Sequence, residues 1–319
     1  MLINHFPKLF HKYILNISNY DDEIEYIIYP NNKIITPKNN RIAHLHIMNL
    51  NDFFDIYGNF IDNIIQFYTI YITFISGDIE KIKYNLNNEI QFLKVKNKGY
   101  DIGPKIAFLD FLYTNNISCN YILFLHSKSD PKKRHEYFNP LIGSIDIIRK
   151  NIKIIENNND IGCIFPNIYK KESHNVKDYS INNMIYLKEI IQLYNLKTND
   201  ITDFSEGNCM ILKKNVVDFI FKNKTRIFYN LCNDKDSFDE NWVRQRFNIS
   251  SKLLLHHLYN DFKNNPDSYK LNNSNHAIGN NLANPNKDMP DGMFEHVWER
   301  LWVNFIYECG MKYFVINNL

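Results

Sequence analysis

The sequence predicts an α/β protein with a mostly parallel central sheet and helices on both faces. Between residues 41 and 127, short β-branched runs alternate with segments whose apolar residues recur at helical spacing, which is typical of βαβ units. These runs are nearly continuously apolar, as expected of strands covered on both faces. The 319 residues contain no internal repeat and no linker-like stretch, so residues 1–319 are predicted to form one domain.

The first half of the chain supplies most of the predicted sheet. Residues 1–40 are a strand-rich lead-in. Strands are then predicted at 41–48, 68–76, 90–97 and 121–127. Helices are predicted between them at 51–67, 77–86 and after Pro104, and Asn51 or Asp52 is the predicted N-cap of the first helix.

The second half is less regular. Helices are predicted at 144–158 and 291–308, short strands at 161–167 and 311–316, and a strand leading into a helix at 207–221. Residues 168–200 and 260–290 are predicted insertions, and the second is a long loop rich in Asn, Asp and Pro.

Composition excludes several classes of protein. Lys and Arg number 37 against 35 Asp and Glu, so a net charge of +2 argues against a nucleic-acid partner and requires any anion site to be local. Five scattered cysteines without a CxxC predict neither a disulfide framework nor a cysteine zinc site. The chain shows no apolar run of the roughly 20 residues that a transmembrane helix needs and no persuasive secretion signal, so a cytoplasmic location is expected.

The exit of the strand at 121–127 carries donors and positive charge, in the stretch HSKSDPKKR. His126, Ser127 and Lys128 directly follow the apolar run, where a ligand of an α/β sheet is expected. Many nucleotide-sugar enzymes place two metal-binding aspartates there. Here Lys128 stands at the first such position and Asp130 at the second, so Lys128 is predicted to screen a diphosphate, while metal binding through Asp130 stays open. The basic run 132–134 alone is better explained as a solvated surface.

The turn NKGYDIGPK follows the strand at 90–97 and is predicted to open on the same crevice. Gly99 and Gly103 allow backbone conformations closed to other residues, and Pro104 suits a first helical turn. The helix start is expected to offer free amides to an anion. Asp101 either holds the ribose or base of a nucleotide or satisfies turn amides. Asn97 opens this turn and is grouped with the donor-binding residues.

The helix at 291–308 supplies candidate acids. Asp291 is its predicted N-cap, and Glu299 lies one turn from Glu295 on the same face, while His296 and Arg300 share the adjacent face. A carboxylate of this helix, placed at the crevice, would remove a proton from an acceptor hydroxyl. An ordinary capped amphipathic helix is an equally good interpretation.

Two shorter motifs are weaker candidates. Glu206 and Gly207 precede a strand and are predicted to contact the acceptor. His44 and His46 alternate along a strand, so both point to one face of the sheet, either toward the crevice or into the core.

Taken together, NKGYDIGPK, YILFLHSKSD, SEGNCMILKK and PDGMFEHVWERLW resemble the rhamnan synthesis protein F family of bacterial polysaccharide glycosyltransferases over roughly residues 40–315. The resemblance implies a GT-A-like nucleotide-diphospho-sugar transferase fold. It also implies transfer of a sugar, typically a deoxyhexose such as rhamnose, from a nucleotide-diphosphate donor to a glycan. The family pattern is matched by Asn97, Gly99, Asp101, Gly103, Pro104, His126, Ser127, Lys128, Gly207, Met210, Asp291, Gly292, His296, Glu299 and Arg300. Glu206 and Phe124 depart from it, so donor and acceptor identity are not carried over.

The expected function is therefore a glycosyltransferase whose partners are a nucleotide-sugar donor and a glycan acceptor. Lys128 and His126 would stabilise the departing diphosphate, and Asp291 first or Glu299 second would be the general base. A divalent metal, Mn or Mg, stays open. Two alternatives remain: a nucleotidyltransferase that makes an activated sugar, and a glycan-binding module without catalysis.

Overall fold

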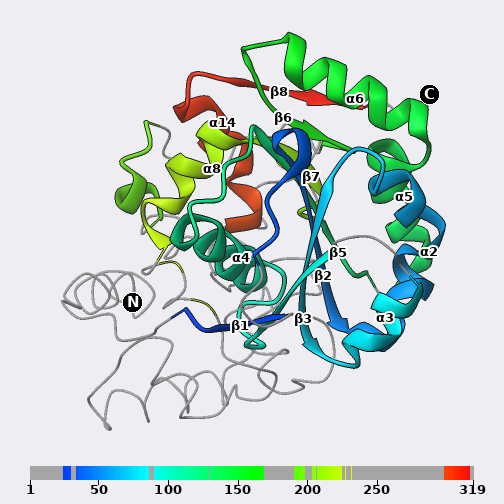
Figure 1. The fold of residues 1–319 in the computed structure, drawn as a ribbon. Helices are drawn as coiled ribbons and strands as arrows, with labels where there is room; N and C mark the ends of the chain where they lie inside the picture. Colours follow the sequence, from blue (N-terminus) through cyan, green and yellow to red (C-terminus); the bar gives the residue numbers. More distant parts are fainter. Residues whose placement is uncertain are drawn as a thin grey trace, which may run out of the picture.

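The computed structural model describes residues 24–29, 34–85, 90–128, 130–168, 190–197, 203–205, 207–224, 227, 231 and 298–316. Within these residues one sheet is formed by β1 (Tyr26–Tyr29), β2 (Arg41–Asn49), β3 (Thr69–Ser76), β4 (Ile90–Val95), β5 (Tyr121–His126), β6 (Ile161–Phe165), β7 (Met210–Lys213) and β8 (Lys312–Val315). Its helices are α2 (Phe53–Ile64), α3 (Ile79–Asn85), α4 (Ile102–Thr114), α5 (Pro131–Ile142), α6 (Ile145–Asn157), α8 (Lys214–Phe221) and α14 (Trp302–Glu308). The α/β class predicted from the sequence is confirmed (Figure 1).

The strand order is β1-β4-β3-β2-β5-β7-β6-β8. Strands β4, β3, β2 and β5 are parallel, and β6 pairs parallel with β8. Strand β7 runs antiparallel to both β5 and β6, and β1 runs antiparallel to β4 at one edge. The sheet is thus mostly parallel, as predicted. The reversed direction of β1 and β7 was not predicted from the sequence.

The chain winds outward from β2 through β3 to β4 and then returns to the other side of β2 as β5. Strand order therefore reverses between β2 and β5. In open α/β sheets such a topological switch point, at the carboxyl ends of the strands, is where ligands bind. Because β7 is antiparallel, its amino end reaches this same edge of the sheet.

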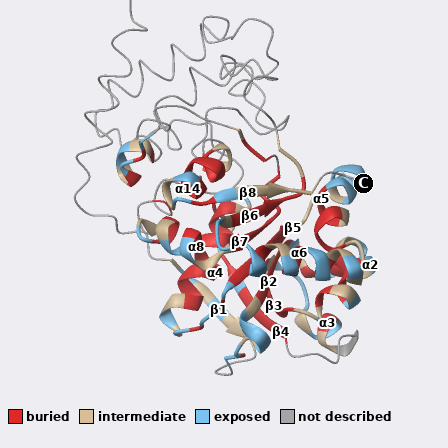
Figure 2. Ribbon diagram, turned by 90° about the horizontal axis from the view of Figure 1, so that it is seen from above, coloured by how far each residue is buried: buried red, intermediate tan, exposed pale blue. Residues whose placement is uncertain are grey.

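Helices cover both faces of the sheet, as predicted. Helices α4, α8 and α14 pack on one face, and α2, α3, α5 and α6 pack on the other (Figures 1 and 2). Two apolar clusters fill the layers between helices and sheet. Trp298, beside α14, is fully buried against Tyr194 and Phe305 and anchors the C-terminal segment in the first cluster.

The starts of two predicted helices differ in detail from their predictions. Asp52 is the N-cap residue of α2, one of the two predicted, but its side chain makes no capping bond. A short 3₁₀ turn at Leu50–Asp52 precedes the helix, and the Asn49 side chain caps this turn by accepting from the Asn51 amide at 3.0 Å. Helix α4 begins at Ile102, two residues before Pro104, because proline is tolerated throughout a first turn.

Helix α5 was not predicted at all. The sequence predicts a polar strand exit after His126 with a solvated basic run at 132–134, but a helix begins at Pro131. The Asp130 carboxylate accepts a hydrogen bond from the Lys132 amide at 2.9 Å and caps it. An Asp before a Pro is a strong helix-start signal, since the side chain caps and the ring presets the first helical φ.

Several predictions fall on residues outside the described ranges. These are the lead-in before residue 24, most of the insertion at 168–200, the loop at 260–290 and the start of the last predicted helix, including Asp291 and His296. Glu206 also lies outside them. Of the predicted insertion, 190–194 is helical.

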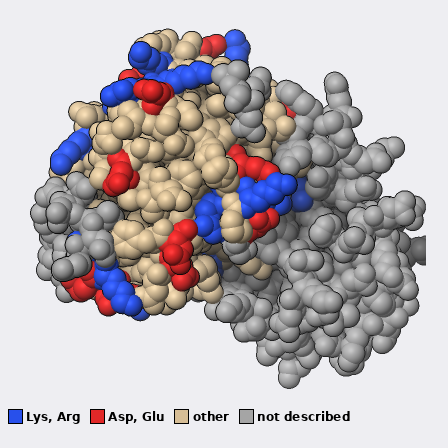
Figure 3. Space-filling view, turned by 90° about the vertical axis from the view of Figure 1, so that its right-hand side faces the viewer, with Lys and Arg blue, Asp and Glu red and all other residues tan. Residues whose placement is uncertain are grey.

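Charges of both signs are interspersed on the described face drawn in Figure 3. On the face drawn in Figure 3, Lys and Arg side chains lie beside Asp and Glu, in agreement with the near-neutral net charge. Among the described helices, none combines the length and the apolar character needed to cross a bilayer.

Candidate functional site

The end of β5 lies at the switch point, in register with two other strands. His46 of β2 pairs with Thr73 of β3 on one side and with His126 of β5 on the other. The Ser127 amide extends the β5 ladder by donating to the His46 carbonyl at 2.9 Å. Residues in register share a face of the sheet, and here that face is covered by α4. The strand exit predicted from HSKSD therefore lies where a ligand of this topology is expected.

The NKGYDIGP turn connects β4 to α4 at the same edge. Gly99 has φ +67°, and a Cβ on Gly103 would lie 1.7 Å from the Lys98 carbonyl oxygen, so both positions require glycine. The Gly99 carbonyl accepts from the amides of Ile102 and Gly103 at 3.0 and 3.2 Å. The prediction of free amides at this helix start is therefore wrong for Ile102 and Gly103, because both amides already donate to the Gly99 carbonyl within the turn.

Asp101 forms a buried ion pair with Lys105, one helical turn further along α4. Its Oδ2 lies 2.5 Å from the Lys105 Nζ, and the two side chains are only 16% and 3% exposed. Burial alone would raise the pKa of Asp101, but the ammonium groups of Lys105 and Lys128 outweigh burial and lower that pKa far below its ordinary value. Asp101 is thus an anion held by Lys105. Its predicted contact with a ribose or base stays a prediction.

His126 is neutral and acts as a hydrogen-bond donor. Burial lowers its pKa to about 3, although the Asp101 carboxylate, 3.8 Å from Nε2, opposes the shift. Nε2 lies 2.5 Å from the Gly207 carbonyl, and since a carbonyl only accepts, this nitrogen carries the proton. His126 is therefore neutral at a strand end enclosed by α4 and the turn before β7, and its predicted role beside a diphosphate stays a prediction.

Gly207 is held from both sides by residues predicted to be catalytic. Its carbonyl accepts from His126, and its amide donates to Glu299 Oε1 at 2.8 Å. Gly207 has φ +89°, and a Cβ there would lie 2.7 Å from the ring of Tyr137 on α5. Next to it, the Asn208 side chain accepts from Trp302 Nε1 at 2.7 Å. This turn therefore joins β5, α5 and the C-terminal segment.

Glu299 is half-buried in this arrangement. Its pKa is raised by burial and by the nearby Asp101 charge, while Lys128 and Arg300 lower it. A raised pKa brings a carboxylate closer to the range in which general bases operate. Its predicted neighbour Arg300 is also half-buried.

Lys128 is half-buried just beyond the end of β5. Its Nζ lies 5.7 Å from the centre of the Tyr137 ring, and its charge lowers the pKa of Asp101 and of Glu299. Lys128 therefore acts electrostatically on both carboxylates. Asp130, by contrast, is exposed and caps α5, so its predicted role in donor or metal binding has no support from neighbouring ligands in the described residues.

We call Asp101, Lys105, His126, Lys128 and Glu299 the switch-point cluster. Four of its members, all except Lys105, were predicted as site residues, although they lie in segments that are far apart in the sequence. Lys105 was missed. The signal for it was an Asp and a Lys four residues apart in an otherwise apolar helix, where a buried lysine needs a partner.

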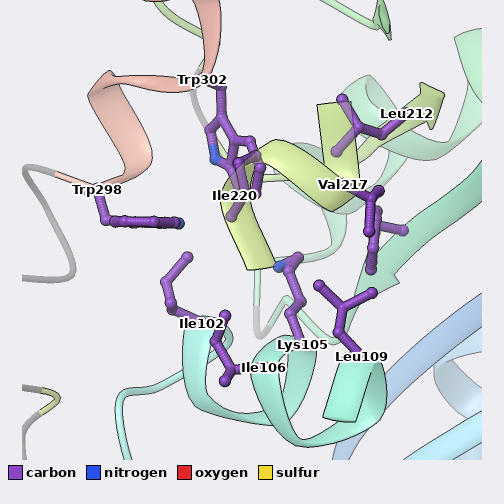
Figure 4. Close-up of a pocket in the computed structure, with 10 residues that line it drawn as sticks. Ile102, Lys105, Ile106, Leu109, Leu212, Val217, Ile220, Trp298 and Trp302 are labelled. Carbon is purple, nitrogen blue, oxygen red and sulfur yellow. The ribbon is translucent and has the colours of Figure 1, made fainter. Parts of the chain in front are cut away.

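Lys105 also borders a small internal cavity. Residues of α4, α8 and the C-terminal segment line this cavity, and Figure 4 shows the Lys105 side chain extending from α4 toward Ile220 and Trp302. The cavity measures about 10 Å³, enough for at most one water molecule. It is a packing defect beneath the cluster and not a ligand pocket.

His44 and His46 of β2 lie on the sheet face that α4 covers. His44 Nε2 and His46 Nδ1 contact the Thr73 hydroxyl at 2.8 and 3.1 Å, and His44 stacks on Phe108. Burial first, and then the Lys105 charge, lowers the pKa of His44 well below its usual value and that of His46 to about 4. Both are therefore neutral core histidines, the more ordinary of the two predicted interpretations.

No three His, Cys, Asp or Glu side chains in the described ranges gather as metal ligands. Comparisons of the chain with protein-family models, with curated proteins and with solved structures find no match. The resemblance described above therefore enters only the proposal that follows.

Proposed function

We propose that the protein is a glycosyltransferase that transfers a sugar from a nucleotide-diphosphate donor to a glycan, using the switch-point cluster. One observation carries the proposal: three segments, with Asp101 of the 97–104 turn, His126 and Lys128 of the β5 exit, and Glu299 of the C-terminal segment, interact where strand order reverses. Ligands of open α/β sheets bind at this position. The resemblance to the rhamnan synthesis protein F family and its GT-A-like fold supports the same function.

Lys128 is the cation that we assign to the donor diphosphate. Asp101 already engages Lys105, and His126 is neutral, so neither Lys105 nor His126 supplies charge to a ligand. The half-buried ammonium of Lys128 lies in a partly desolvated setting, where its attraction for an anion exceeds that of a fully exposed lysine.

In the proposed reaction an acceptor hydroxyl oxygen forms a bond to the anomeric carbon of the donor sugar. The bond from that carbon to the diphosphate oxygen breaks, and its electron pair leaves with the nucleoside diphosphate. Lys128 stabilises the charge that grows on this leaving group. If the reaction inverts configuration, a carboxylate accepts the hydroxyl proton. Glu299, which lies within the described residues, is one candidate for this general base. Asp291, which lies outside them, is the other.

His126 and Gly207 have a positioning role in this scheme. The His126 N–H and the Glu299 carboxylate hold the Gly207 peptide between them, which fixes the distance between the β5 exit and the C-terminal segment. A side chain on residue 207 would collide with Tyr137, which lies below Lys128.

A panel of UDP-, GDP- and dTDP-sugars tests the proposal through consumption of donor and release of nucleoside diphosphate. We expect one donor to be consumed in the presence of a glycan acceptor. Lys128→Ala should abolish this activity, whereas Lys150→Ala, which removes an exposed lysine on α6, should not. Wild-type turnover by Lys128→Ala would refute the assignment, and an EDTA titration of the wild-type activity tells whether a metal takes part.

The same assays separate the alternatives. Release of pyrophosphate from a nucleoside triphosphate and a sugar phosphate would indicate the nucleotidyltransferase. Glycan binding without donor consumption would indicate the binding module.

A further inference from the structure

Arg134 of α5 turns its guanidinium back onto the loop that carries Lys128. Its Nε and Nη2 donate to the Lys128 carbonyl at 3.2 and 2.9 Å, and its Nη1 donates to the Asp55 carbonyl on α2 at 2.9 Å. The sequence had placed Arg134 in a solvated basic run. In the structure it joins the β5 exit to two helices.

The contact matters because the Lys128 carbonyl lies beyond the end of the sheet. Strand β5 ends at His126, and the last ladder bond in this loop is donated by Ser127. At the other end of the loop, Asp130 caps α5. Between these two fixed points, the described contacts of the Lys128 carbonyl are the two hydrogen bonds from Arg134.

Arginine suits this task for a geometric reason. Its planar guanidinium offers several N–H groups in fixed directions, so one side chain reaches two carbonyls at once. A lysine ammonium in the same place would carry the same charge without that fork. Charge and geometry are therefore separable by substitution.

We propose that Arg134 is a positioning residue for Lys128, and that it acts on the donor diphosphate only by holding the Lys128 main chain. The inference rests on the proposed function, since it assigns Lys128 to a diphosphate. It predicts that the effects of Arg134 and Lys128 on diphosphate affinity are coupled and not additive.

The test is a double-mutant cycle read by calorimetry with UDP, GDP and dTDP as probes and the corresponding nucleosides as references. Arg134→Ala should weaken binding of the preferred nucleoside diphosphate by roughly tenfold. Without the two hydrogen bonds from Arg134, the Lys128 main chain is no longer held and its ammonium group is no longer fixed beside the diphosphate. Nucleoside affinity should stay unchanged. Arg134→Lys should lose nearly as much as Arg134→Ala, and Arg134→Ala combined with Lys128→Ala should bind like Lys128→Ala alone.

Arg149→Ala, which removes an exposed arginine of α6, is the matched control and should bind as wild type. Melting temperatures of all variants identify those that fail to fold, and Arg134→Lys, which keeps the charge, stands in if Arg134→Ala does not fold. Additive losses, or wild-type affinity in Arg134→Lys, would overturn the positioning role while leaving the proposed function intact. Wild-type affinity in Lys128→Ala, or no binding of any of the three probes to the wild type, would overturn both.

Discussion

Acidification should destabilise the fold through three buried histidines that are neutral when folded. His44, His46 and His126 are each less than 7% exposed. Each has a pKa below its ordinary 6.5, to about 4 for His46 and about 3 for His126, with burial as the largest cause. The unfolded chain therefore takes up protons that the folded chain refuses, and stability falls as pH drops from 6.5 toward the folded pKa values.

The expected size follows from linkage. One histidine that titrates near 6.5 only when unfolded costs about 1.4 kcal/mol at pH 5.5 and almost nothing at pH 7.5. Three such groups give a loss of roughly 4 kcal/mol, a large fraction of the 5–15 kcal/mol that stabilises a typical domain. Glu299 works in the opposite direction, since its raised pKa favours the folded state as pH falls toward 4.5. Any gain from Glu299 between pH 7.5 and 5.5 would therefore reduce the net loss that the histidines cause.

Urea unfolding followed by fluorescence at pH 7.5, 6.5 and 5.5 measures this free energy. His46→Asn should reduce the change in unfolding free energy between pH 7.5 and 5.5 by about a third, because one of the three histidines no longer titrates. His135→Asn, at an exposed site on α5, should leave it unchanged. A free energy of unfolding that stays constant across these pH values would show that the histidines are not held neutral, and the description of the cluster would be wrong.

Three further substitutions test the site. Gly207→Ala should cost about 2 kcal/mol or more in unfolding free energy, since it combines positive φ with a ring contact. Gly310→Ala, with φ +69° and open space, should cost only about 1 kcal/mol, and equal costs would refute the packing argument. Lys105→Met should destabilise by about 3 kcal/mol at pH 7 because Asp101 is left buried without its partner. Adding Asp101→Asn should recover most of that loss in urea unfolding, and no recovery would contradict the pairing. Glu299→Gln should lower kcat about 100-fold and leave donor affinity unchanged if it is the base. Full kcat in steady-state assays would exclude that role.

The parallel strands were predictable because each is a continuous apolar, β-branched run between turn signals. Helix α5 was missed because charged residues and two prolines obscure its periodicity, although Asp130 and Pro131 marked its start. The reversed direction of strand β7 was not predicted, since a strand of four residues, three of them apolar, carries no information on direction.

The meeting of the 97–104 turn with the β5 exit was predictable from the rule that strand carboxyl ends share an edge. The protonation state of His126 was not predictable from the sequence, because it depends on which elements bury the end of β5. The bond between Gly207 and Glu299 spans 92 residues of sequence, and no local pattern indicates it.

The central claim is that Lys128 and the 97–104 turn together bind a diphosphate. A crystal structure of the protein with the nucleoside diphosphate selected by calorimetry tests it most directly. We predict phosphate oxygens within hydrogen-bonding distance of Lys128 Nζ at the switch point. A diphosphate bound elsewhere on the molecule, with Lys128 turned into bulk solvent, would contradict the account.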